Sequence, residues 1–433
     1  MDALQTRSFL DSLLGKPAAE GQDWLKALRS RALERANVLA VPSPRDEEWR
    51  FTDLTPLYQA SLGAAADVGP DPDRDALARF AVPEASATLV FVDGRYCAGL
   101  SSVRAASGLI VGNFSAVAVE LPDSVEHWVG NAAPFLHDLF TAVNTARLRD
   151  GAVIHAARDV SAGPVHCLFV ATRKDVAVHP RVFVRADSGA DVTVIEDYVS
   201  LQDGAYCVNA VSEVFVAAHA RVRHVRLQRD STRAFHMANT GVSVGRDGRY
   251  SNCSVALGAR ISRHTLSVEQ TGPGTEFELD GLALIAGRQL ADTHSFVDHA
   301  QPNGTSRQQH KCVVAGGAHA VFNGRILVRE GAQQTNSAQE SRNLLLSDKA
   351  HVDTKPQLEI FADDVKCAHG AAVGQLEAEE VFYLRSRGLS EAAARGLLTY
   401  GFAADVVDRI PVPSLVAALH RIIVNQTGGP QLG

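Results

Sequence analysis

The stretch GGAHAVFNGRILVREGAQQTNSAQESRNLLLSDKAHVDTKPQLEI, residues 316–360, decides the fold class. It consists of short runs with strand-forming residues, each preceded by a corner that contains glycine, alanine or asparagine. Similar runs recur from about Val153 to Val373, among them SGADVTVIEDY, AHARVRHVRL and GPGTEFELDGLALI. Almost no helical period is present in this zone. Strands so short, with corners so frequent, predict an all-β stack.

Two all-β architectures fit this pattern, a sandwich or barrel and a parallel β-solenoid. The spacing between corners is irregular, which weakens a strict hexapeptide repeat, but hairpin signals are scarce for so many strands. The GADV, GAHA and GAQQ corners and the polar run QQTNSAQESRN fit coils whose bends stack small and amide residues. These features favour the solenoid. Because coils bury a core only against their neighbours, we expect the flanking helical segments to close both ends.

The N-terminal segment, residues 1–86, is predicted to be a helical region. Trp24, Leu28 and Ala32 recur at helical spacing, with charged residues between them. Prolines then break the pattern, and a link rich in glycine, alanine, proline and aspartate follows at residues 64–75. This link is the best candidate boundary in the first half of the chain.

Residues 87–375 are predicted to form the β-helix core. The core opens with TLVFVDGRY, which has the pattern of a strand entering an Asp-Gly turn. A helical insertion is expected near residues 134–149, in PFLHDLFTAVNTARLRDG, with Gly151 as its cap.

The last segment, residues 376–433, is predicted to be a C-terminal helical domain of three helices. The first ends with Gly388 at the position after its C-cap, and the second begins with Ser390 as its N-cap. This domain either folds back on the solenoid or docks a partner. The apolar face of the second helix is expected to hold Leu398, Phe402 and Val406.

Composition excludes several classes of function. The chain of 433 residues has a formal net charge of −7 and no run of Lys or Arg, so it lacks the basic face that nucleic-acid binding needs. No apolar stretch is long enough to span a bilayer and the first residues do not resemble a signal peptide, so we expect a cytoplasmic protein that is not bound to a membrane. Neither a GxxxxGK[ST] loop nor a GxSxG motif is present, so we expect that this chain does not hydrolyse nucleotides by itself and has no serine nucleophile of that type.

The six cysteines contain no CxxC pair, so we expect free thiols and neither a zinc ribbon nor a ferredoxin-type cluster motif. Any bound metal must draw its ligands from distant segments or from another chain. Cys253 lies on a strand-like segment without a nearby histidine, and a core position is its expected role.

The strongest group of chemically active residues is DDVKCAHG, residues 363–370. On a strand, Cys367 and His369 point to the same face, with Cα atoms roughly 6.5–7 Å apart. A thiolate and an imidazole on one face suit Fe(II), Zn(II) or a nascent iron–sulfur unit. They also suit a Cys–His nucleophile pair, because a neighbouring imidazolium lowers the thiol pKa. The structural alternative is a small buried cysteine beside a hydrogen-bonded histidine.

A second group of potential ligands lies in DTHSFVDHAQPNGTSRQQHKC. None of its spacings matches a known metal motif, and two of its histidines differ in strand parity, so they cannot share a face of one strand. A solenoid bend stabilised by Asp–His hydrogen bonds is therefore expected rather than a metal site. The residues are His294, His299, His310 and Cys312.

Three stretches resemble the SufB/SufD family of iron–sulfur cluster assembly scaffolds. The most specific is LEIFADDVKCAHGAAVGQLEAEEVFYLRSRGLSEAAARGLLTYGFA, and VFNGRILVREGAQQTNSAQESRNLLLSDKAHVDTKPQLEI and EEWRFTDL fit the same family. The resemblance covers about residues 47 to 410. Within the family, KCAHGA followed by VFYLRSRG is similar to the SufD pattern.

The resemblance implies a right-handed parallel β-helix core with helical domains at both termini, acting as a scaffold and not as an enzyme. It implies a heterodimer with a SufB-like paralogue through the β-helix edges and a SufC-like ATPase bound to the C-terminal helices. It also implies that Cys367 and His369 lie at the SufB–SufD interface, where they serve iron acquisition and cluster building. No stably bound cofactor is expected, only transient iron or a nascent iron–sulfur cluster.

Two other interpretations stay open. The first is a β-helix carbohydrate-active enzyme, which usually needs acidic or basic clusters with aromatic platforms on one outer face. Aromatic residues make up only 6% of the chain, and no such stripe of charges is apparent in the sequence. The second is a homodimeric scaffold that works without a SufB-like subunit.

Overall fold

The computed structural model describes residues 3–15, 22–65, 70–104, 106–120, 126 and 128–428. Parts of the predicted N-terminal region (1–2, 16–21 and 66–69) and the end of the predicted C-terminal domain (429–433) lie outside the described residues. In the described part of the chain, no helix is both long and apolar enough to cross a membrane.

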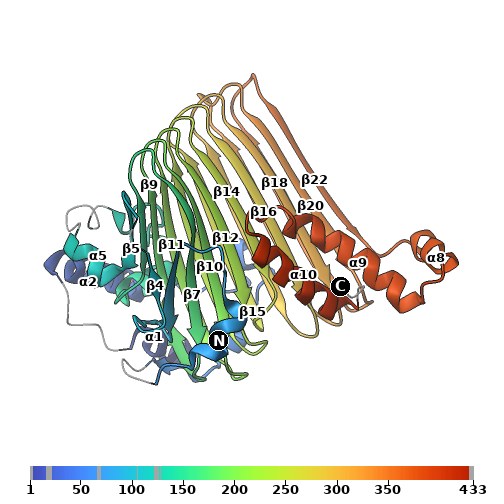
Figure 1. Ribbon diagram of the computed structural model, residues 1–433, viewed down its shortest axis with the longest axis horizontal. Coiled ribbons are helices and arrows are strands. Elements are labelled where there is room, and N and C mark those ends of the chain that lie inside the picture. Colours follow the sequence, from blue (N-terminus) through green and yellow to red (C-terminus); the bar gives the residue numbers. More distant parts are fainter. Residues whose placement is uncertain are drawn as a thin grey trace.

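The core is a parallel β-solenoid made of two 11-stranded sheets, which confirms the predicted fold class (Figure 1). Successive strands of the chain alternate between the sheets, so each coil adds one strand to each. Sheet A contains, in order, β6 (Ala152–Ala156), β9 (Arg181–Ala186), β11 (Cys207–Val216), β13 (Phe235–Val244), β15 (Ile261–Gln270), β17 (Leu290–His299), β19 (His319–Val328) and β21 (His351–Ile360). Sheet B contains β7 (Ser161–Ala171), β10 (Asp191–Ser200), β12 (Arg221–Arg229), β14 (Arg249–Ala256), β16 (Glu276–Ile285), β18 (Thr305–Val314), β20 (Asn336–Leu345) and β22 (Lys366–Gly374).

Side chains alternate along each strand between a lumen enclosed by the two sheets and an outer face. Near the start of the solenoid the lumen is filled by apolar residues such as Val184, Val194 and Val214, all fully buried. Parallel pairing stacks each lumenal position on the same position of the next coil, so the side chains form columns that run along the solenoid axis.

The corners stack as regularly as the strands. Asp159 and Asp247 adopt left-handed backbone angles, with φ of 59° and 52°, and a glycine occupies the equivalent corner of the next coil. At Gly189 a Cβ atom would lie only 2.1 Å from Oδ1 of Asp159, and at Gly274 it would lie 2.2 Å from Oδ1 of Asp247. Glycine is therefore favoured at these corners, because it adopts a positive φ without strain and leaves room for the aspartate side chain of the preceding coil.

The first coil is closed by antiparallel strands. β2 (Ala87–Val92) pairs in parallel with β7, and it pairs antiparallel with β3 (Arg95–Tyr96), with which it forms a hairpin, and with β4 (Ser102–Val103). The predicted Asp-Gly turn is confirmed, because Asp93 and Gly94 both have positive φ angles. On sheet A, β5 (Leu109–Asn113) runs antiparallel to β6, and the short β1 (Gly63–Ala64) pairs with β8 (Val176–Val178), which in turn pairs with β11.

The N-terminal helices pack on the outer face of sheet A rather than over an end of the solenoid (Figure 1). Their apolar side chains meet Phe183, Phe235, Met237 and Ile261 on the outer face of the sheet. The elements of this layer are α1 (Ala3–Leu14), α2 (Asp23–Val38), η1 (Glu47–Trp49), α3 (Thr55–Tyr58), α5 (Phe114–Glu120) and α7 (Leu139–Ala146); α4 (Arg74–Leu77) and η2 (Ala78–Phe80) connect them to the core.

The insertion predicted near residues 134–149 is the helix α7, which is shorter than expected. Asp138 caps its N-terminus, accepting a hydrogen bond from the backbone N–H of Thr141. The prediction that Gly151 caps its C-terminus is wrong, because the helix ends at Ala146. Gly151 instead lies against the backbone of Arg181, where a Cβ atom would be 2.4 Å from the carbonyl oxygen.

The C-terminal domain consists of α8 (Ala378–Ser386), α9 (Glu391–Val407) and α10 (Pro413–Thr427). Both predicted caps are confirmed: Gly388 has a φ of 99°, and the Ser390 side chain accepts a hydrogen bond from the backbone N–H of Ala393. The predicted apolar face of α9 is displaced, because Leu398 and Phe402 are only partly buried. The fully buried positions of α9 include Thr399, Ala403, Val406 and Val407.

The expectation that helices close both ends of the solenoid is wrong at the C-terminal end. Helices α9 and α10 pack on the outer face of sheet B, against Val225, Val255 and Leu284. The last coil, β21 and β22, is the terminal coil of both sheets in the described part of the chain, and most of β22 is exposed. The predicted helical domains thus cover faces of the solenoid and leave its final edge open (Figure 1).

Candidate functional site

The two predicted site residues lie on β22, the final strand of sheet B. Cys367 is paired in register with Ser337 of β20, and His369 with Gln339. Ser337 and Gln339 are buried lumenal residues, so Cys367 and His369 share the lumenal face, as expected from their spacing. Cys367 is partly buried and His369 is exposed, because no further coil among the described residues covers them. The structure therefore places both side chains at the open end of the lumen.

Cys367 is the most accessible of the six cysteines, all of which are free. Burial raises the pKa of its thiol, although a backbone hydrogen bond from Ser337 acts in the opposite direction. Deeper thiols are held more firmly in the protonated form, since burial raises the pKa of Cys207 and of Cys312 to about 12. Cys367 is consequently the thiol best placed to lose its proton to an incoming metal ion.

Polar side chains continue inward from these two residues. The hydroxyl groups of Ser337 and Ser306 lie 2.7 Å apart, and Ser306 lies 2.9 Å from Nε2 of His299. Beneath His369, Nε2 of Gln339 donates to Oε1 of Gln308 at 2.8 Å. The mouth of the lumen is therefore lined by hydrogen-bonded polar groups.

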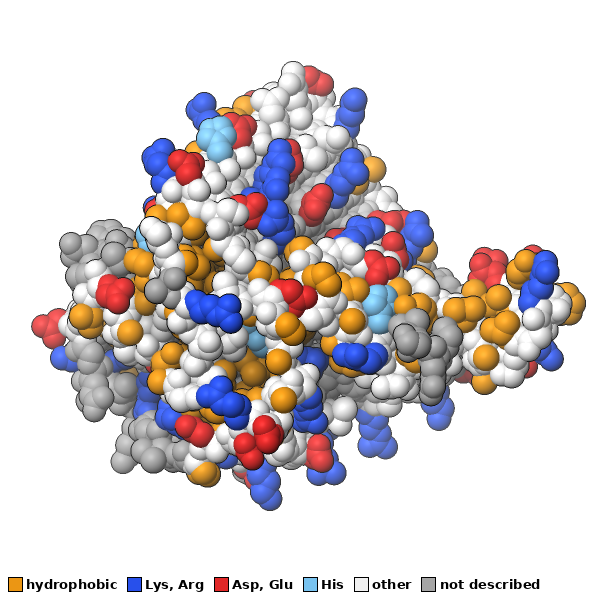
Figure 2. All heavy atoms as spheres, viewed as in Figure 1, with side chains coloured by type: hydrophobic (Ala, Val, Ile, Leu, Met, Phe, Trp, Pro, Cys, Tyr) orange, Lys and Arg blue, Asp and Glu red, His pale blue; other side chains and the backbone are white. Residues whose placement is uncertain are grey.

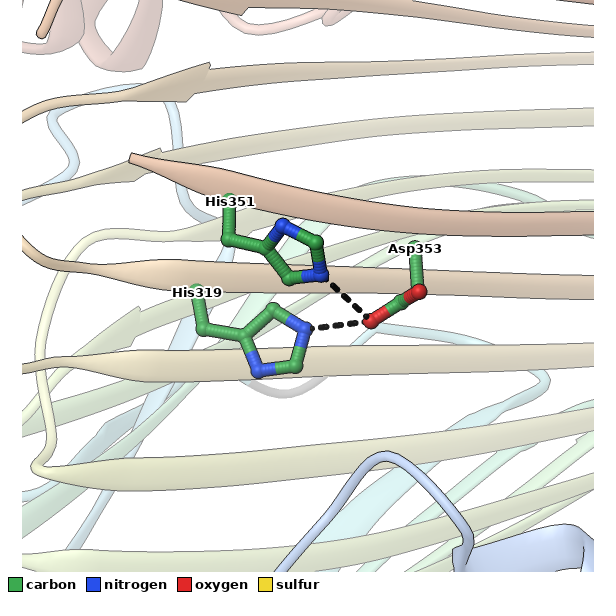
Figure 3. Close-up of side chains that lie close together, drawn as sticks. All are labelled: His319, His351 and Asp353. Carbon is green, nitrogen blue, oxygen red and sulfur yellow. Dashed lines mark hydrogen bonds and ion pairs between the residues drawn. The ribbon is translucent and has the colours of Figure 1, made fainter. Parts of the chain in front are cut away.

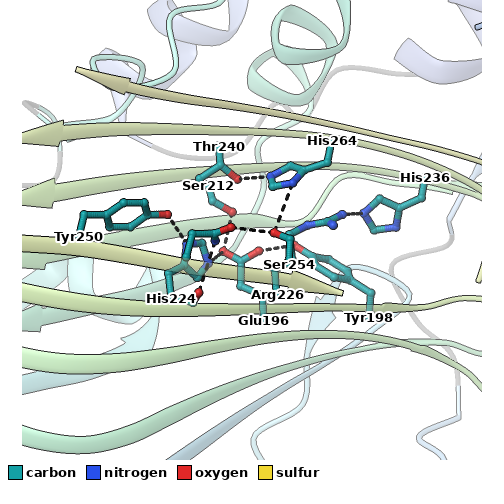
Figure 4. A network of polar contacts seen from close by, with 11 residues as sticks. Glu196, Tyr198, Ser212, His224, Arg226, His236, Thr240, Tyr250, Ser254 and His264 are labelled. Atoms are coloured by element: carbon teal, nitrogen blue, oxygen red, sulfur yellow. Dashed lines mark hydrogen bonds and ion pairs between the residues drawn. The ribbon is translucent and has the colours of Figure 1, made fainter. Parts of the chain in front are cut away.

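Further in, a charged network is sealed inside the solenoid (Figure 4). Glu196 accepts hydrogen bonds from the hydroxyls of Ser212 (2.6 Å) and Tyr198 (2.8 Å) and lies 3.0 Å from Nε2 of His224. Burial alone would raise the pKa of this carboxyl group, but His224, Ser212 and Arg226 outweigh burial and lower the pKa to about 2. Glu196 is thus a carboxylate deep in a protein core.

The same network fixes the protonation of its other members. The Arg226 guanidinium donates to Nε2 of His236 at 2.5 Å, so that ring is neutral at Nε2 and its Nδ1 donates to Asp230 at 2.8 Å. Burial, together with Arg226, lowers the pKa of His236, and Asp230 only partly offsets this. Every charge is compensated by a neighbour, which is the condition for keeping such groups in a core.

The second group of predicted residues is split between two faces. His294 points outward and contacts Asp292 (3.0 Å) and Glu48 (3.2 Å). Burial would lower the pKa of His294, but Asp292 and Glu48 raise it above its usual value. His299, His310 and Cys312 point into the lumen, where the His310 ring stacks on Phe322 at 4.6 Å and its Nδ1 lies 3.6 Å from Sγ of Cys312. These residues take part in local structural contacts and do not converge on one point.

Cys253 is buried on the outer face of sheet B, where its thiol lies 3.9 Å from the carbonyl oxygen of Val406 in α9. Burial raises its pKa well above the usual value for a thiol. Its position fits the expected core role.

A groove of roughly 760 Å³ crosses the outer face of sheet B next to the C-terminal helices and reaches His369. Charged side chains gather on this side of the solenoid (Figure 2), so the inference from the sequence that no charged stripe exists is wrong. Many of the charges are paired, as in Arg223–Asp191 and Arg409–Asp280. Burial raises the pKa of Asp280 to about 6, although Arg409 opposes the shift. The groove contains no Trp, Tyr or Phe among its described lining residues.

One cluster of potential metal ligands is not indicated by any pattern in the sequence. His319, His351 and Asp353 bring their donor atoms within 4.8 Å of one another on the outer face of sheet A. The two histidines are neighbours only because β19 and β21 pair in the register His319↔His351. No local motif in the sequence could have indicated this contact.

The chain matches two family descriptions that together cover most of its length. Residues 169–402 match "SUF system FeS cluster assembly, SufBD core domain", and residues 17–164 match "SufBD protein N-terminal region". An iron–sulfur cluster assembly SufBD family protein of Synechocystis is 39% identical over 412 residues, covering 92% of this chain and 90% of that protein. The iron–sulfur cluster assembly protein SufD of Escherichia coli is 33% identical over 381 residues, covering 86% of this chain and 85% of that protein. The SufD protein of Bacillus subtilis is 28% identical over 414 residues, covering 92% and 93%. The chain therefore belongs to the SufBD family of iron–sulfur cluster assembly proteins.

Proposed function

We propose that this chain is a non-catalytic scaffold subunit of a complex that assembles iron–sulfur clusters. Its open end pairs with a SufB-like paralogue, and Cys367 and His369 contribute ligands for transient iron or a nascent cluster. The observation that carries the proposal is the position of these two residues on the lumenal face of β22, where no further coil in the described part of the chain covers them.

The exposed edge supports a partner at this end. A terminal strand in a sheet presents backbone donors and acceptors that can pair with another chain. Apolar side chains lie exposed beside this edge, including Phe361, which is 64% exposed, together with Ile360 and Val373. Solenoids need a cover on their terminal repeats, so a partner at this end would cover the strand edge that the isolated chain leaves exposed.

The ligand count also supports a second chain. Cys367 and His369 supply one sulfur and one nitrogen, whereas iron in a protein takes four or more ligands. Among the described residues, no third His, Cys, Asp or Glu joins these two in a metal-binding group. A paralogue that stacks on β22 would supply the remaining ligands. Labile ligation shared between chains also suits a scaffold, because the cluster must leave it.

The C-terminal domain is proposed to bind a SufC-like ATPase. Helix α8 extends away from the solenoid (Figure 1), and its Phe382 and Tyr383 side chains are 71% and 56% exposed. Large exposed aromatic residues on one projecting helix are typical of protein-binding surfaces. The double variant Phe382→Ala/Tyr383→Ala is expected to lose the ATPase during co-purification while keeping the SufB-like subunit.

The site assignment is tested with Cys367→Ala and His369→Ala in the complex co-expressed with both partners. We expect both variants to assemble the complex but to load less iron and to mature fewer client enzymes. Lys366→Ala is the matched control, because it lies on the same strand with its side chain on the opposite face. Client maturation equal to wild type in Cys367→Ala and His369→Ala would show that the site assignment is wrong.

The edge pairing has its own test. The backbone N–H of Lys366 donates to Thr335 on the inner neighbour, so by strand alternation the N–H of Ala371 points to the open edge. Ala371→Pro should therefore remove a partner-facing donor and block the heterodimer without unfolding the solenoid. Ala372→Pro, one residue further, should instead damage the pairing of β22 with β20. If Ala371→Pro retains the SufB-like subunit, the partner does not add a strand to this edge.

A homodimer is the second candidate, because two copies could cover each other's open ends. Mass measurement of the complex purified from the native host separates the two: the heterodimer gives a second polypeptide, the homodimer twice the mass of this chain. A carbohydrate-active enzyme is less well supported, since the groove on sheet B lacks the aromatic platform that sugar binding usually uses. Cleavage of a polysaccharide panel would refute the non-catalytic role.

A further inference from the structure

The cluster His319–His351–Asp353 lies on the outer face of sheet A, in its last two strands (Figure 3). Oδ2 of Asp353 is 2.8 Å from Nε2 of His319 and 3.2 Å from Nε2 of His351. The two imidazole rings lie 4.9 Å apart, which is the spacing of neighbouring strands. Both rings thus turn the same nitrogen toward one carboxylate oxygen.

We propose that these three residues form a binding site for a divalent transition-metal ion. Zinc and similar ions bind imidazole nitrogen at about 2.0–2.1 Å and carboxylate oxygen at about 2.0–2.2 Å, so tetrahedral ligand atoms lie roughly 3.3 Å from each other. The two N···O distances of 2.8 and 3.2 Å are already close to this spacing. An ion replaces the protons that the carboxylate now shares with the imidazoles.

The backbone fixes the positions of the three proposed ligands. The paired register of β19 and β21 fixes the Cα positions of the histidines, and Asp353 follows His351 by two residues on the same face. The His351 side chain is 65% exposed, so its ring can rotate to close the donor triangle. The N-terminal layer reaches this coil through the contact between Glu47 and Lys355, at 2.7 Å, and leaves the cluster accessible.

The donor set defines the class of ion. Two imidazoles and one carboxylate suit borderline ions such as Zn²⁺, Co²⁺, Ni²⁺ and Fe²⁺, whereas Ca²⁺ and Mg²⁺ prefer sets made only of oxygen. Three protein ligands leave at least one coordination position for water or a ligand from outside. The site lies on the opposite sheet from Cys367 and His369, and on the outer face rather than the lumenal one, so the inference does not depend on the proposed function.

Titration with Co²⁺ tests the site, because cobalt absorption reports both geometry and ligand type. The full chain is purified without a histidine tag and under reducing conditions. We expect one equivalent of Co²⁺ to bind with ligand-field bands but without the charge-transfer band of a thiolate ligand. Zn²⁺ is expected to displace it. Replacing a ligand should weaken binding at least about tenfold, since even the loss of a side chain that hydrogen-bonds to a metal ligand costs that much.

Three variants and one control decide the outcome. His319→Ala, His351→Ala and the isosteric Asp353→Asn should each lose the equivalent of Co²⁺ while keeping the circular dichroism spectrum and melting temperature of the metal-free wild type. His219→Ala is the control: His219 is also 65% exposed and lies 3.7 Å from an aspartate, Asp247, but among the described residues it belongs to no group of three potential ligands. Equal Co²⁺ affinity in wild type and His351→Ala, or no binding to wild type, would each overturn the proposal.

Discussion

Glu213→Gln is expected to loosen the N-terminal layer from the solenoid. Glu213 is fully buried on the outer face of sheet A and forms an ion pair with the equally buried Arg181. Its carboxylate also accepts hydrogen bonds from the backbone N–H groups of Gly130 (2.9 Å), Ala132 (3.0 Å) and Ala133 (3.3 Å). One carboxylate thus attaches the segment before α7 to β11.

The size of the effect follows from what the substitution leaves behind. Glutamine keeps the shape and one acceptor oxygen, so several contacts survive, but the Arg181 guanidinium loses its counter-charge in a buried site. Asn144 and Thr145 still accept from it, at 3.0 and 3.2 Å, but neither carries a charge. Breaking one partner of a buried ion pair costs about 3–5 kcal/mol. Removing the cation as well, in Arg181→Met/Glu213→Gln, should restore part of that loss.

Tryptophan fluorescence during urea unfolding measures the loss of unfolding free energy in the N-terminal layer itself. The three tryptophans, Trp24, Trp49 and Trp128, all belong to the layer on sheet A or to the segment that Glu213 holds. The control is Glu276→Gln, which breaks a half-exposed ion pair with Arg249 at 3.2 Å and should cost less than about 1 kcal/mol. A loss in Glu213→Gln no larger than in Glu276→Gln would refute the reasoning.

Three further outcomes are expected from the lumen and the C-terminal domain. Gly281→Ala places a Cβ atom 2.3 Å from the His310 ring and should destabilise the core by about 1–3 kcal/mol. Gly331→Ala is the control and should be tolerated, because its Cβ atom would have no other atom within 4 Å. The melting temperatures of the two variants test this difference. Burial lowers the pKa of His299 and of His310 from 6.5 to about 4, although Asp298 opposes the shift at His299, so the unfolded chain binds more protons in this range. The free energy of unfolding therefore keeps this contribution above pH 6.5 and falls by about 1.4 kcal/mol per pH unit per histidine between pH 6.5 and pH 4. Unfolding measured at a series of pH values should show a smaller dependence on pH in His310→Gln than in wild type. Ser390→Ala removes the N-cap of α9 and should cost about 1 kcal/mol, measured as a lower melting temperature.

Local sequence patterns predicted those features that depend on neighbouring residues. The common face of Cys367 and His369 follows from the two-residue period of a strand, and the caps Gly388 and Ser390 follow from backbone requirements at helix ends. The parallel solenoid was also predictable, because frequent corners and scarce hairpin signals both result from strands that pair with the next coil rather than with the next segment.

Features that depend on packing between distant segments were predicted wrongly or missed. The helical domains were expected at the ends, but the apolar residues that they cover lie on outer faces, at Phe235 on sheet A and Val255 on sheet B. In a solenoid these residues alternate with lumenal ones, and the sequence does not show which of the two faces is the core. The His319–His351 contact joins residues that only the register of two coils brings together.

The columns of lumenal side chains stop at the open end of the solenoid. Every lumenal side chain inside the solenoid has a neighbour on each side along its column, as Gln339 has Gln308 and His369. Cys367 and His369 end their columns and have a neighbour on one side only. A partner strand that pairs with β22 continues both columns and places its own lumenal side chains about 4.8 Å beyond these two residues. Side chains at that spacing can reach a shared ion, since ligand atoms bound to one metal lie within about 3–4 Å of each other. In the proposed assembly, a strand added at this edge would therefore also complete the proposed metal site, whereas a partner docked on an outer face of the solenoid would do neither.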